Sequence, residues 1–223
     1  MSTKRKKFSF LHRNGLSFVF LIFTILSLAG QIYNGWKEHN EFLADHHACC
    51  QSPAQYLRSG HFLQATFENW ESEFFQMALF VVLTIFLRQE GSSESKKCGE
   101  ANIDRDDLVP KKDSPAAVRR GGLWLALYKH SLSVALIFLF IACFLLHWYG
   151  SWMDFNEQQV LEHKPAQGLM QFLSGSKLWF ESFQNWQSEF LSVFAIIYLS
   201  IYLRQIGSPQ SKPVNAAHAE TGE

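Results

Sequence analysis

Apolar residues gather in four blocks along this chain, and polar stretches separate the blocks. The first and third blocks each hold about 18 residues without a charge, the length that a helix needs to cross a hydrocarbon core of about 30 Å. The second and fourth reach that length only if the polar residues before them also enter the bilayer. The pattern therefore predicts an all-α membrane protein with four transmembrane helices. The four blocks are Leu16–Tyr33, Glu73–Leu87, Leu132–Tyr149 and Glu189–Leu203.

The chain also contains an internal duplication. A shift of about 116 residues lays residues 14–96 on residues 130–212 without a gap, and roughly 26 of about 83 positions are then identical. The clearest repeated segment is FENWESEF at Phe67–Phe74, which returns as FQNWQSEF at Phe183–Phe190. Each repeat would hold an even number of spans, so the repeats are expected to be two parallel helical hairpins.

The duplication divides the chain into five parts. Each repeat is predicted to contain two transmembrane helices joined by an external loop. The linker as far as about Arg120 is charged, contains Pro110 and Pro115, and lacks periodicity, so we expect a mobile tether there and in the tail. The parts are a basic cytoplasmic N-terminus (1–13), the first repeat (14–96), a cytoplasmic linker with the entry to the third helix (97–129), the second repeat (130–212) and a cytoplasmic tail (213–223).

Positive charge is distributed unevenly, although the formal net charge is zero. Most basic residues precede the first block or lie between the second and third. The other two loops hold only Lys37, Arg58, Lys164 and Lys177. The positive-inside rule therefore places both termini and the linker in the cytoplasm. No small-residue cleavage site follows the first block, so a cleaved signal peptide is not expected.

Polar residues recur on one face of each predicted helix. In the second span Asn69 and Glu73 are one turn apart, and the fourth span repeats this pair. Small and polar residues at helical spacing mark faces where transmembrane helices approach and hydrogen-bond. We predict that the four polar faces meet in one cluster. The six residues that carry this prediction are Gln31, Asn69, Glu73, His147, Asn185 and Glu189.

Glu73 and Glu189 leave two interpretations open. An ionisable group within a span is costly, and it usually faces the interior or has a function. Two carboxylates near one axis would need a proton, a cation or His147 between them. The polar faces are therefore either a packing core or part of an ion or proton site.

Two other groups of residues are weaker candidates. The external segment with His46, His47, Cys49 and Cys50 has residue types that bind metals. The second repeat does not preserve this cluster, so we expect a variable solvated loop and no metal or other cofactor.

His130 and His147 bracket the third span as haem ligands would. They are 17 residues apart and point to different faces, and Asn14 and Gln31 replace them in the first repeat. A haem-binding membrane redox protein is therefore the third hypothesis for function. The sequence lacks a nucleophile elbow, a phosphate loop and a dinucleotide fingerprint, so no enzyme is predicted. The basic N-terminus is short and is interpreted as a topology signal, not as a nucleic-acid arm.

Several motifs resemble a bacterial family of small, uncharacterised membrane proteins that is known only as a domain of unknown function. They are NGLS, YLRSGHF and ATFENWESEF in the first repeat, HSLS and WFESFQNWQSEF in the second, and the shared LRQ-GS pattern. The resemblance covers nearly the whole chain except the linker and tail. It implies a bacterial cytoplasmic-membrane location and carries over no activity or site residue.

Together these patterns favour a non-enzymatic, multi-pass membrane protein whose polar helix faces form a structural or interaction core. Its expected partners are the lipid bilayer and either a second copy or another membrane protein, with no nucleic acid. The alternative is a small permease or an ion- or proton-conducting module that uses Glu73 and Glu189.

Overall fold

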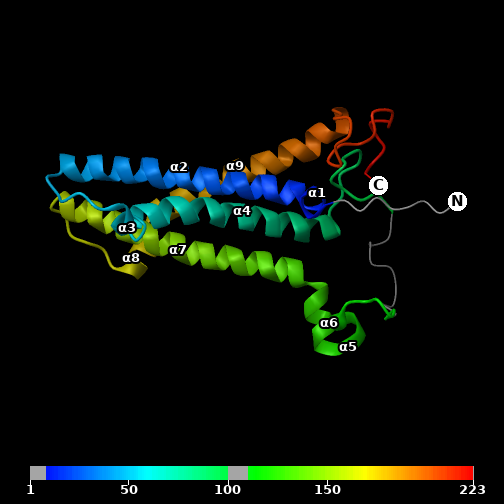
Figure 1. Ribbon diagram of the computed structural model, residues 1–223, viewed down its shortest axis with the longest axis horizontal. Helices are drawn as coiled ribbons and strands as arrows, with labels where there is room; N and C mark the ends of the chain where they lie inside the picture. The colour runs from blue at the N-terminus through cyan, green and yellow to red at the C-terminus, as the bar shows by residue number, and fades with distance from the viewer. Residues whose placement is uncertain (1–8, 100–109, 223) are drawn as a thin grey trace. The chain divides into compact units, whose positions relative to one another are not determined.

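The computed structural model describes residues 9–99 and 110–222, and every helix or strand assigned within them is an α-helix. Lys4 to Lys7 and Arg105, which contribute to the predicted charge asymmetry, lie outside this part. In chain order the helices are α1 (Phe10–Arg13), α2 (Gly15–Asp45), α3 (Pro53–Tyr56), α4 (Gly60–Phe86), α5 (Ala116–Arg120), α6 (Gly122–Lys129), α7 (Ser131–Leu161), α8 (Leu169–Leu173) and α9 (Ser176–Tyr202) (Figure 1).

Two of the described helices, α2 and α7, are long and apolar enough to cross a membrane. Each has 31 residues, a length of about 46 Å at 1.5 Å per residue. They contain the first and third apolar blocks of the sequence, and no residue in the most apolar part of α2 is buried. Helices α4 and α9 have 27 residues each, but the polar repeated segment occupies part of their length.

The helix bounds recur with a constant offset. Helices α2 and α7 begin 116 residues apart and have equal lengths, and the same is true of α4 and α9. Just after α2 and α7, His47 and His163 both adopt a φ of 58°, a left-handed conformation that is uncommon outside glycine. The two halves of the sequence therefore fold into the same succession of elements.

The chain forms two compact units. The first consists of Met1–Leu63 and Gly150–Ala166, and the second of Gln64–Tyr149 and Gln167–Glu223. Helix α7 contributes its first part to the second unit and its last part to the first. Each unit thus combines segments from both sequence repeats.

In the first unit, the loop after α2 is held against that helix. Asn40 donates to the carbonyl of Gln51 at 2.9 Å and accepts from its backbone N–H at 2.7 Å, and Trp36 donates to the same carbonyl at 2.7 Å. Tyr56 of α3 packs so close to Gly35 that a Cβ there would lie 2.2 Å from its hydroxyl. Gly35 is therefore needed for this close contact between α2 and α3.

In the second unit, α4, α9 and the first part of α7 pack around Phe75 of α4. Its ring centroid lies 4.9 Å from that of Phe140 in α7. In α9, Trp186 and Phe190 lie 4.6 Å and 5.8 Å from it. These aromatic contacts join the three helices that carry the candidate site.

Helices α4 and α9 end in the same way. Arg88 Nη1 donates to the carbonyls of Thr84, Ile85 and Leu87. Arg204 makes the same three bonds, with lengths that match to 0.1 Å, at the end of α9. The arginines thereby satisfy carbonyls that have no partner within a helix, and their positive charge lies at the favourable end of the helix dipole.

The tail, which the sequence suggested would be a mobile extension, is bound to these helix ends. Lys212 Nζ donates to the carbonyls of Ala217, His218 and Glu220, at distances of 2.7–3.2 Å. Thr221 accepts from the N–H of Gly91 at 3.0 Å. The linker also contains structure, because α5 forms within the stretch that showed no periodicity. Local hydrogen bonding of this kind leaves no periodic pattern in a sequence.

Candidate functional site

One face of α4 carries carboxylates into the second unit. Gln64, Glu68, Glu71 and Phe75 follow one another at steps of four, three and four residues, which places them on one side of the helix. The Glu71 side chain is fully buried and Glu68 is partly buried. Because a buried charge is strongly unfavourable without a partner, these carboxylates depend on groups from α7 and α9.

Glu71 is held by two other helices. Its Oε2 lies 2.6 Å from Nδ1 of His147 in α7, and its Oε1 accepts from Nε1 of Trp186 in α9 at 3.0 Å. His147 is also fully buried. The short distance is typical of a charge-assisted hydrogen bond in which the Nδ1–H donates to the carboxylate. Glu71 therefore fixes the orientation of the imidazole.

The other ring nitrogen of His147 faces Glu181 in α9, with 3.3 Å between Nε2 and Oε2. The second oxygen of Glu181 accepts from Nε2 of Gln64 at 2.8 Å and lies 3.4 Å from Nζ of Lys177. His147 thus lies between one carboxylate from α4 and one from α9.

Glu68 completes the arrangement. Its carboxylate accepts a short hydrogen bond from the side-chain amide of Asn185 in α9. One ligand atom each from Glu68, His147 and Glu181 lie within 4.8 Å of one another, and no other such group of metal-ligand residues occurs among the described residues. We call Glu68, Glu71, His147 and Glu181 the acidic–histidine centre.

A proton or a metal ion is needed between Nε2 of His147 and Oε2 of Glu181. With Nδ1–H donating to Glu71, a neutral imidazole would direct the lone pair of Nε2 at a carboxylate, and that contact is repulsive. A proton on either of the two atoms, or a metal ion between them, would remove the repulsion. Two ligand atoms about 2.0–2.1 Å from a tetrahedral zinc ion are about 3.3–3.4 Å apart, so the observed separation suits either one. If a metal ion binds to Nε2 of His147, Glu71 would hold the opposite nitrogen and so orient the ligating imidazole.

A family model described as "Domain of unknown function (DUF6766)" matches residues 7–223. The chain belongs to the DUF6766 family. The resemblance to a family of unknown function is therefore confirmed, and the match also includes the linker and the tail. Neither the curated proteins nor the solved structures contain a match to this chain.

The two glutamates predicted from the repeated motif of this DUF6766 chain lie together. The carboxyl groups of Glu73 and Glu189 lie close enough to interact with each other. Glu73 is exposed and Glu189 is half-buried. Two ionised carboxylates in such a contact would repel each other. None of the hydrogen bonds described above for the acidic–histidine centre involves Glu73 or Glu189.

The other four predicted residues have different positions. His147 is the imidazole of the centre, and Asn185 binds its carboxylate Glu68. Asn69 is exposed and donates to the carbonyl of Ala65 in its own helix at 2.8 Å. Gln31 is half-buried in α2 of the first unit. That Gln31 shares one polar cluster with residues of the second unit stays a prediction.

Sequence reasoning missed the three carboxylates of the centre. The predicted glutamates were chosen because they recur in both repeats, whereas the three carboxylates of the centre do not recur. Glu68 and Glu71 correspond to Gln184 and Gln187, and Glu181 corresponds to Ala65. His147 likewise corresponds to Gln31. What the sequence does show is that, at each of these four positions, one repeat has an ionisable residue and the other repeat has none.

The weaker candidates receive no further support. His46, His47, Cys49 and Cys50 are all exposed, and both cysteines are free thiols. They do not form a group of three metal-ligand residues within the described part of the chain. His130, the second proposed haem ligand, is exposed at the junction of α6 and α7. The haem hypothesis stays a prediction without a supporting contact.

Proposed function

We propose that this chain is a non-enzymatic, multi-pass protein of the bacterial cytoplasmic membrane and that it binds one divalent cation at the acidic–histidine centre. Helices α2, α4, α7 and α9 cross the bilayer as two parallel hairpins, with both termini in the cytoplasm. The exposed apolar surface of α2 and the positions of the basic residues support this topology. Lipid is the main partner, and a second copy or another membrane protein covers part of the helical surface. Nucleic acid is not a partner.

The observation that carries the cation site is the contact of His147 Nε2 with Glu181 Oε2 at 3.3 Å. The opposite nitrogen is already engaged by Glu71. Imidazole and carboxylate ligands suit zinc and related divalent ions, and Glu68 lies near enough to supply a third ligand atom. A divalent ion would offset the surplus of negative charge that three glutamates create around one histidine.

A packing core is the second candidate, and a specific observation favours it. Each carboxylate of the centre already has a hydrogen-bond donor, namely Asn185 for Glu68, Trp186 for Glu71 and Gln64 for Glu181. In this case a proton on His147 supplies the positive charge, and the network joins α4, α7 and α9.

A small permease or proton-conducting module is the third candidate. The neighbouring carboxyl groups of Glu73 and Glu189 favour it, because two adjacent carboxyl groups could take up a proton and pass it on. Proton flux into proteoliposomes that contain the protein, compared with a Glu189→Gln variant, tests this function.

Metal binding to the purified protein tests the main proposal. The exposed His46, His47, Cys49 and Cys50 would also take up zinc. All measurements therefore use a background protein that carries four substitutions, namely His46→Asn, His47→Asn, Cys49→Ser and Cys50→Ser. We expect this background protein to bind one Zn²⁺ per chain by calorimetry and to retain about one equivalent after dialysis, as measured by elemental analysis. Acidification should weaken binding, because protons compete for His147 and the carboxylates.

Two variants identify the site. His147→Gln introduces the residue that the first repeat has at the matching position, and Glu181→Gln preserves size while removing a charge. Both should abolish binding, whereas Glu73→Gln should leave it unchanged. Absence of zinc and manganese binding in a folded background protein would overturn the proposal and favour the packing core.

A further inference from the structure

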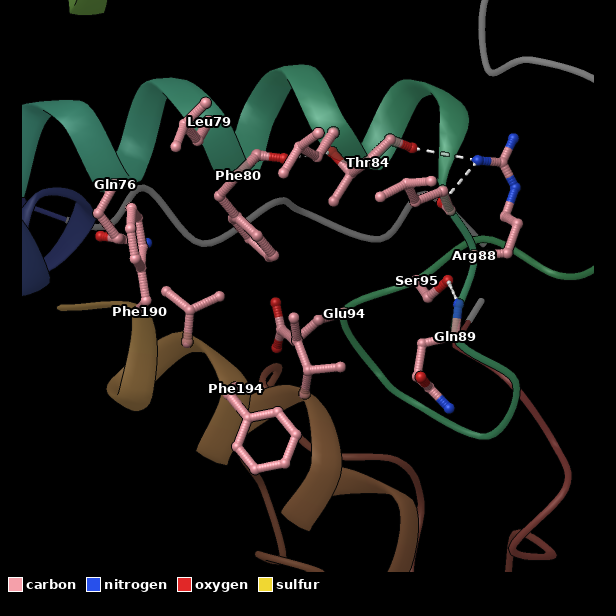
Figure 2. A pocket seen from close by; sticks show the side chains of 14 residues that line it. Gln76, Leu79, Phe80, Thr84, Arg88, Gln89, Glu94, Ser95, Phe190 and Phe194 are labelled. Carbon is pink, nitrogen blue, oxygen red and sulfur yellow. Dashed lines mark hydrogen bonds between the residues drawn. The ribbon is translucent and has the colours of Figure 1, made fainter. Parts of the chain in front are cut away.

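A cavity lies between α4 and α9 within the second unit, away from the contacts of the acidic–histidine centre. Its volume is about 360 Å³, within the range of about 300–1,000 Å³ that small-molecule sites occupy. Figure 2 shows the two helices on either side of it and the loop after α4 beside it. The apolar lining comes from both helices, with Leu79, Phe80 and Leu83 from α4 and Phe190, Val193 and Phe194 from α9.

One carboxylate projects into this apolar space. Glu94, in the loop after α4, lines the cavity, and Figure 2 shows its carboxylate between Phe80 and Phe194. Burial raises the pKa of the Glu94 carboxyl above its ordinary value, an effect that a hydrogen bond from Ser93 partly offsets. A half-buried carboxylate beside aromatic rings is a poor neighbour for an acyl chain alone, because the chain would desolvate the charge without compensating it.

The fold does not require an acid at this position. The matching residue in the second repeat is Gln210, yet the two loops have the same backbone pattern. Glu94 N–H donates to Ser92 Oγ at 3.1 Å, and Gln210 N–H donates to Ser208 Oγ at 3.1 Å. The charge of Glu94 is therefore an addition to a loop that forms equally well without it.

Arg88 also lines the cavity, but its charge is engaged elsewhere. Its guanidinium donates to three carbonyls at the end of α4, and Figure 2 shows it turned away from the space between the helices. Within residues 9–99 and 110–222, no ion pair joins Glu94 to a basic group. The cavity thus combines three aromatic rings with one carboxylate that forms no ion pair with any basic group in the described part of the chain.

We propose that this cavity binds an organic cation with an apolar body, whose charge pairs with Glu94 and whose body lies against Phe80, Phe190 and Phe194. Aromatic faces attract cations through the ring quadrupole, and the attraction increases where water is excluded. The carboxylate selects for positive charge, and the size of the cavity admits a drug-sized molecule. This site is independent of the divalent cation proposed for the acidic–histidine centre.

Two probe ions of nearly the same size and opposite charge test the proposal. Equilibrium binding of tetraphenylphosphonium and of tetraphenylborate is measured on the full chain in lipid nanodiscs, with protein-free nanodiscs correcting for partition into lipid. We expect saturable binding of one phosphonium per chain and no saturable binding of the borate. Acidification through the raised pKa of Glu94 should weaken phosphonium binding, because the proton neutralises the carboxylate.

Two substitutions copied from the second repeat separate the contributions. Glu94→Gln introduces the amide found at position 210, and it should weaken phosphonium binding about tenfold or more and remove its pH dependence. Phe194→Ala introduces the residue found at position 78, and it should weaken binding several-fold while leaving the pH dependence. Glu90→Gln, which changes an exposed acid in the same loop, is the matched control and should bind as the wild type does.

Three results would overturn the proposal. They are phosphonium binding that Glu94→Gln leaves unchanged, saturable borate binding of similar strength, and a co-purified phospholipid that the phosphonium does not displace. The last result would assign the cavity to a lipid chain.

Discussion

The carboxylate of Glu71 in α4 and the imidazole of His147 in α7 are in direct contact, with 2.6 Å between Oε2 and Nδ1, and both side chains are fully buried. The two residues are 76 positions apart in the chain. Their contact joins the two sequence repeats, because Glu71 belongs to the first repeat and His147 to the second. Neither residue has an ionisable counterpart in the other copy, since Gln187 and Gln31 occupy the matching positions. The acidic–histidine centre is therefore built from residues that the two repeats do not share.

The first prediction concerns this pair. Glu71→Gln removes a buried charge and leaves His147 with a weaker partner. Breaking a buried ion pair by removing one member typically costs about 3–5 kcal/mol. We expect the free energy of unfolding in detergent to fall by about that amount, as measured by titration with a denaturing detergent. Glu41→Gln, at an exposed position of α2, is the control and should change it by less than about 0.5 kcal/mol. Equal stability of the two variants would show that the pair is not ionised.

Much of the helical framework could be predicted from the sequence. The apolar blocks Leu16–Tyr33 and Leu132–Tyr149 lie within α2 and α7, whose lengths follow from continuous apolar spacing and good helix formers. The repeated offset also appears in the helix bounds. These features depend on local pattern, which a single sequence contains in full.

The site was harder to predict, because a helical pattern does not reveal which face meets a neighbour. Glu71 and Glu73 are two residues apart, so they project about 200° apart around α4. Both belong to the same polar segment, and the sequence pattern favoured Glu73 because Glu189 repeats it. Only the packing of Phe75 against α7 and α9 turns Glu71 inward. That packing depends on contacts between residues far apart in the sequence, and the comparison of the two repeats contains no information on such contacts.

The second prediction concerns the tail. Lys212→Met removes the ammonium that donates to three carbonyl oxygens, and it should release the tail from the end of α9. We expect limited proteolysis to cleave the tail at least several-fold faster than in the wild type, with the helical circular dichroism unchanged. Lys96→Met is the matched control, because Lys96 occupies the same position in the first repeat and its ammonium makes no hydrogen bond within the described residues. Equal cleavage rates in both variants would contradict the role of Lys212.

The third prediction is a pH dependence that arises from Glu94. Burial raises the pKa of its carboxyl in the folded protein above the value of 4.5 expected for an unperturbed side chain. The folded state therefore binds the proton more tightly than the unfolded state, so the protonated acid favours folding. The stability that this side chain contributes is fully present below pH 4.5 and is lost as the pH rises through the raised pKa. Glu94→Gln should melt at a higher temperature than the wild type at neutral pH, and the difference should diminish toward pH 4. A difference that persists unchanged at pH 4 would exclude titration of Glu94 as its cause.

The fourth prediction concerns the proposed topology. Reporter fusions after Asp45 and after Lys164 should be external, and a fusion after Lys112 should be cytoplasmic, because the positively charged segments remain inside. A pair of reporters with opposite requirements, alkaline phosphatase and a fluorescent protein, gives complementary readings at each point. The reversed pattern at any one of the three points would exclude two parallel hairpins with cytoplasmic termini.

The last prediction concerns Glu73 in α4 and Glu189 in α9, whose carboxyl groups lie close enough to interact with each other. A glutamine at either position preserves the size of the side chain and can still donate to the remaining carboxylate. If the pair only joins the two helices, Glu73→Gln and Glu189→Gln should each change the free energy of unfolding by about 0.6 kcal/mol, the average for a hydrogen bond between membrane helices. Glu189→Leu has no hydrogen-bonding group and should destabilise the protein more than Glu189→Gln does. If Glu189→Gln loses proton flux in proteoliposomes while its stability stays normal, the pair would instead be assigned to proton transfer. Equal stability of the Glu189→Leu and Glu189→Gln variants would show that a hydrogen bond at this position contributes nothing to folding.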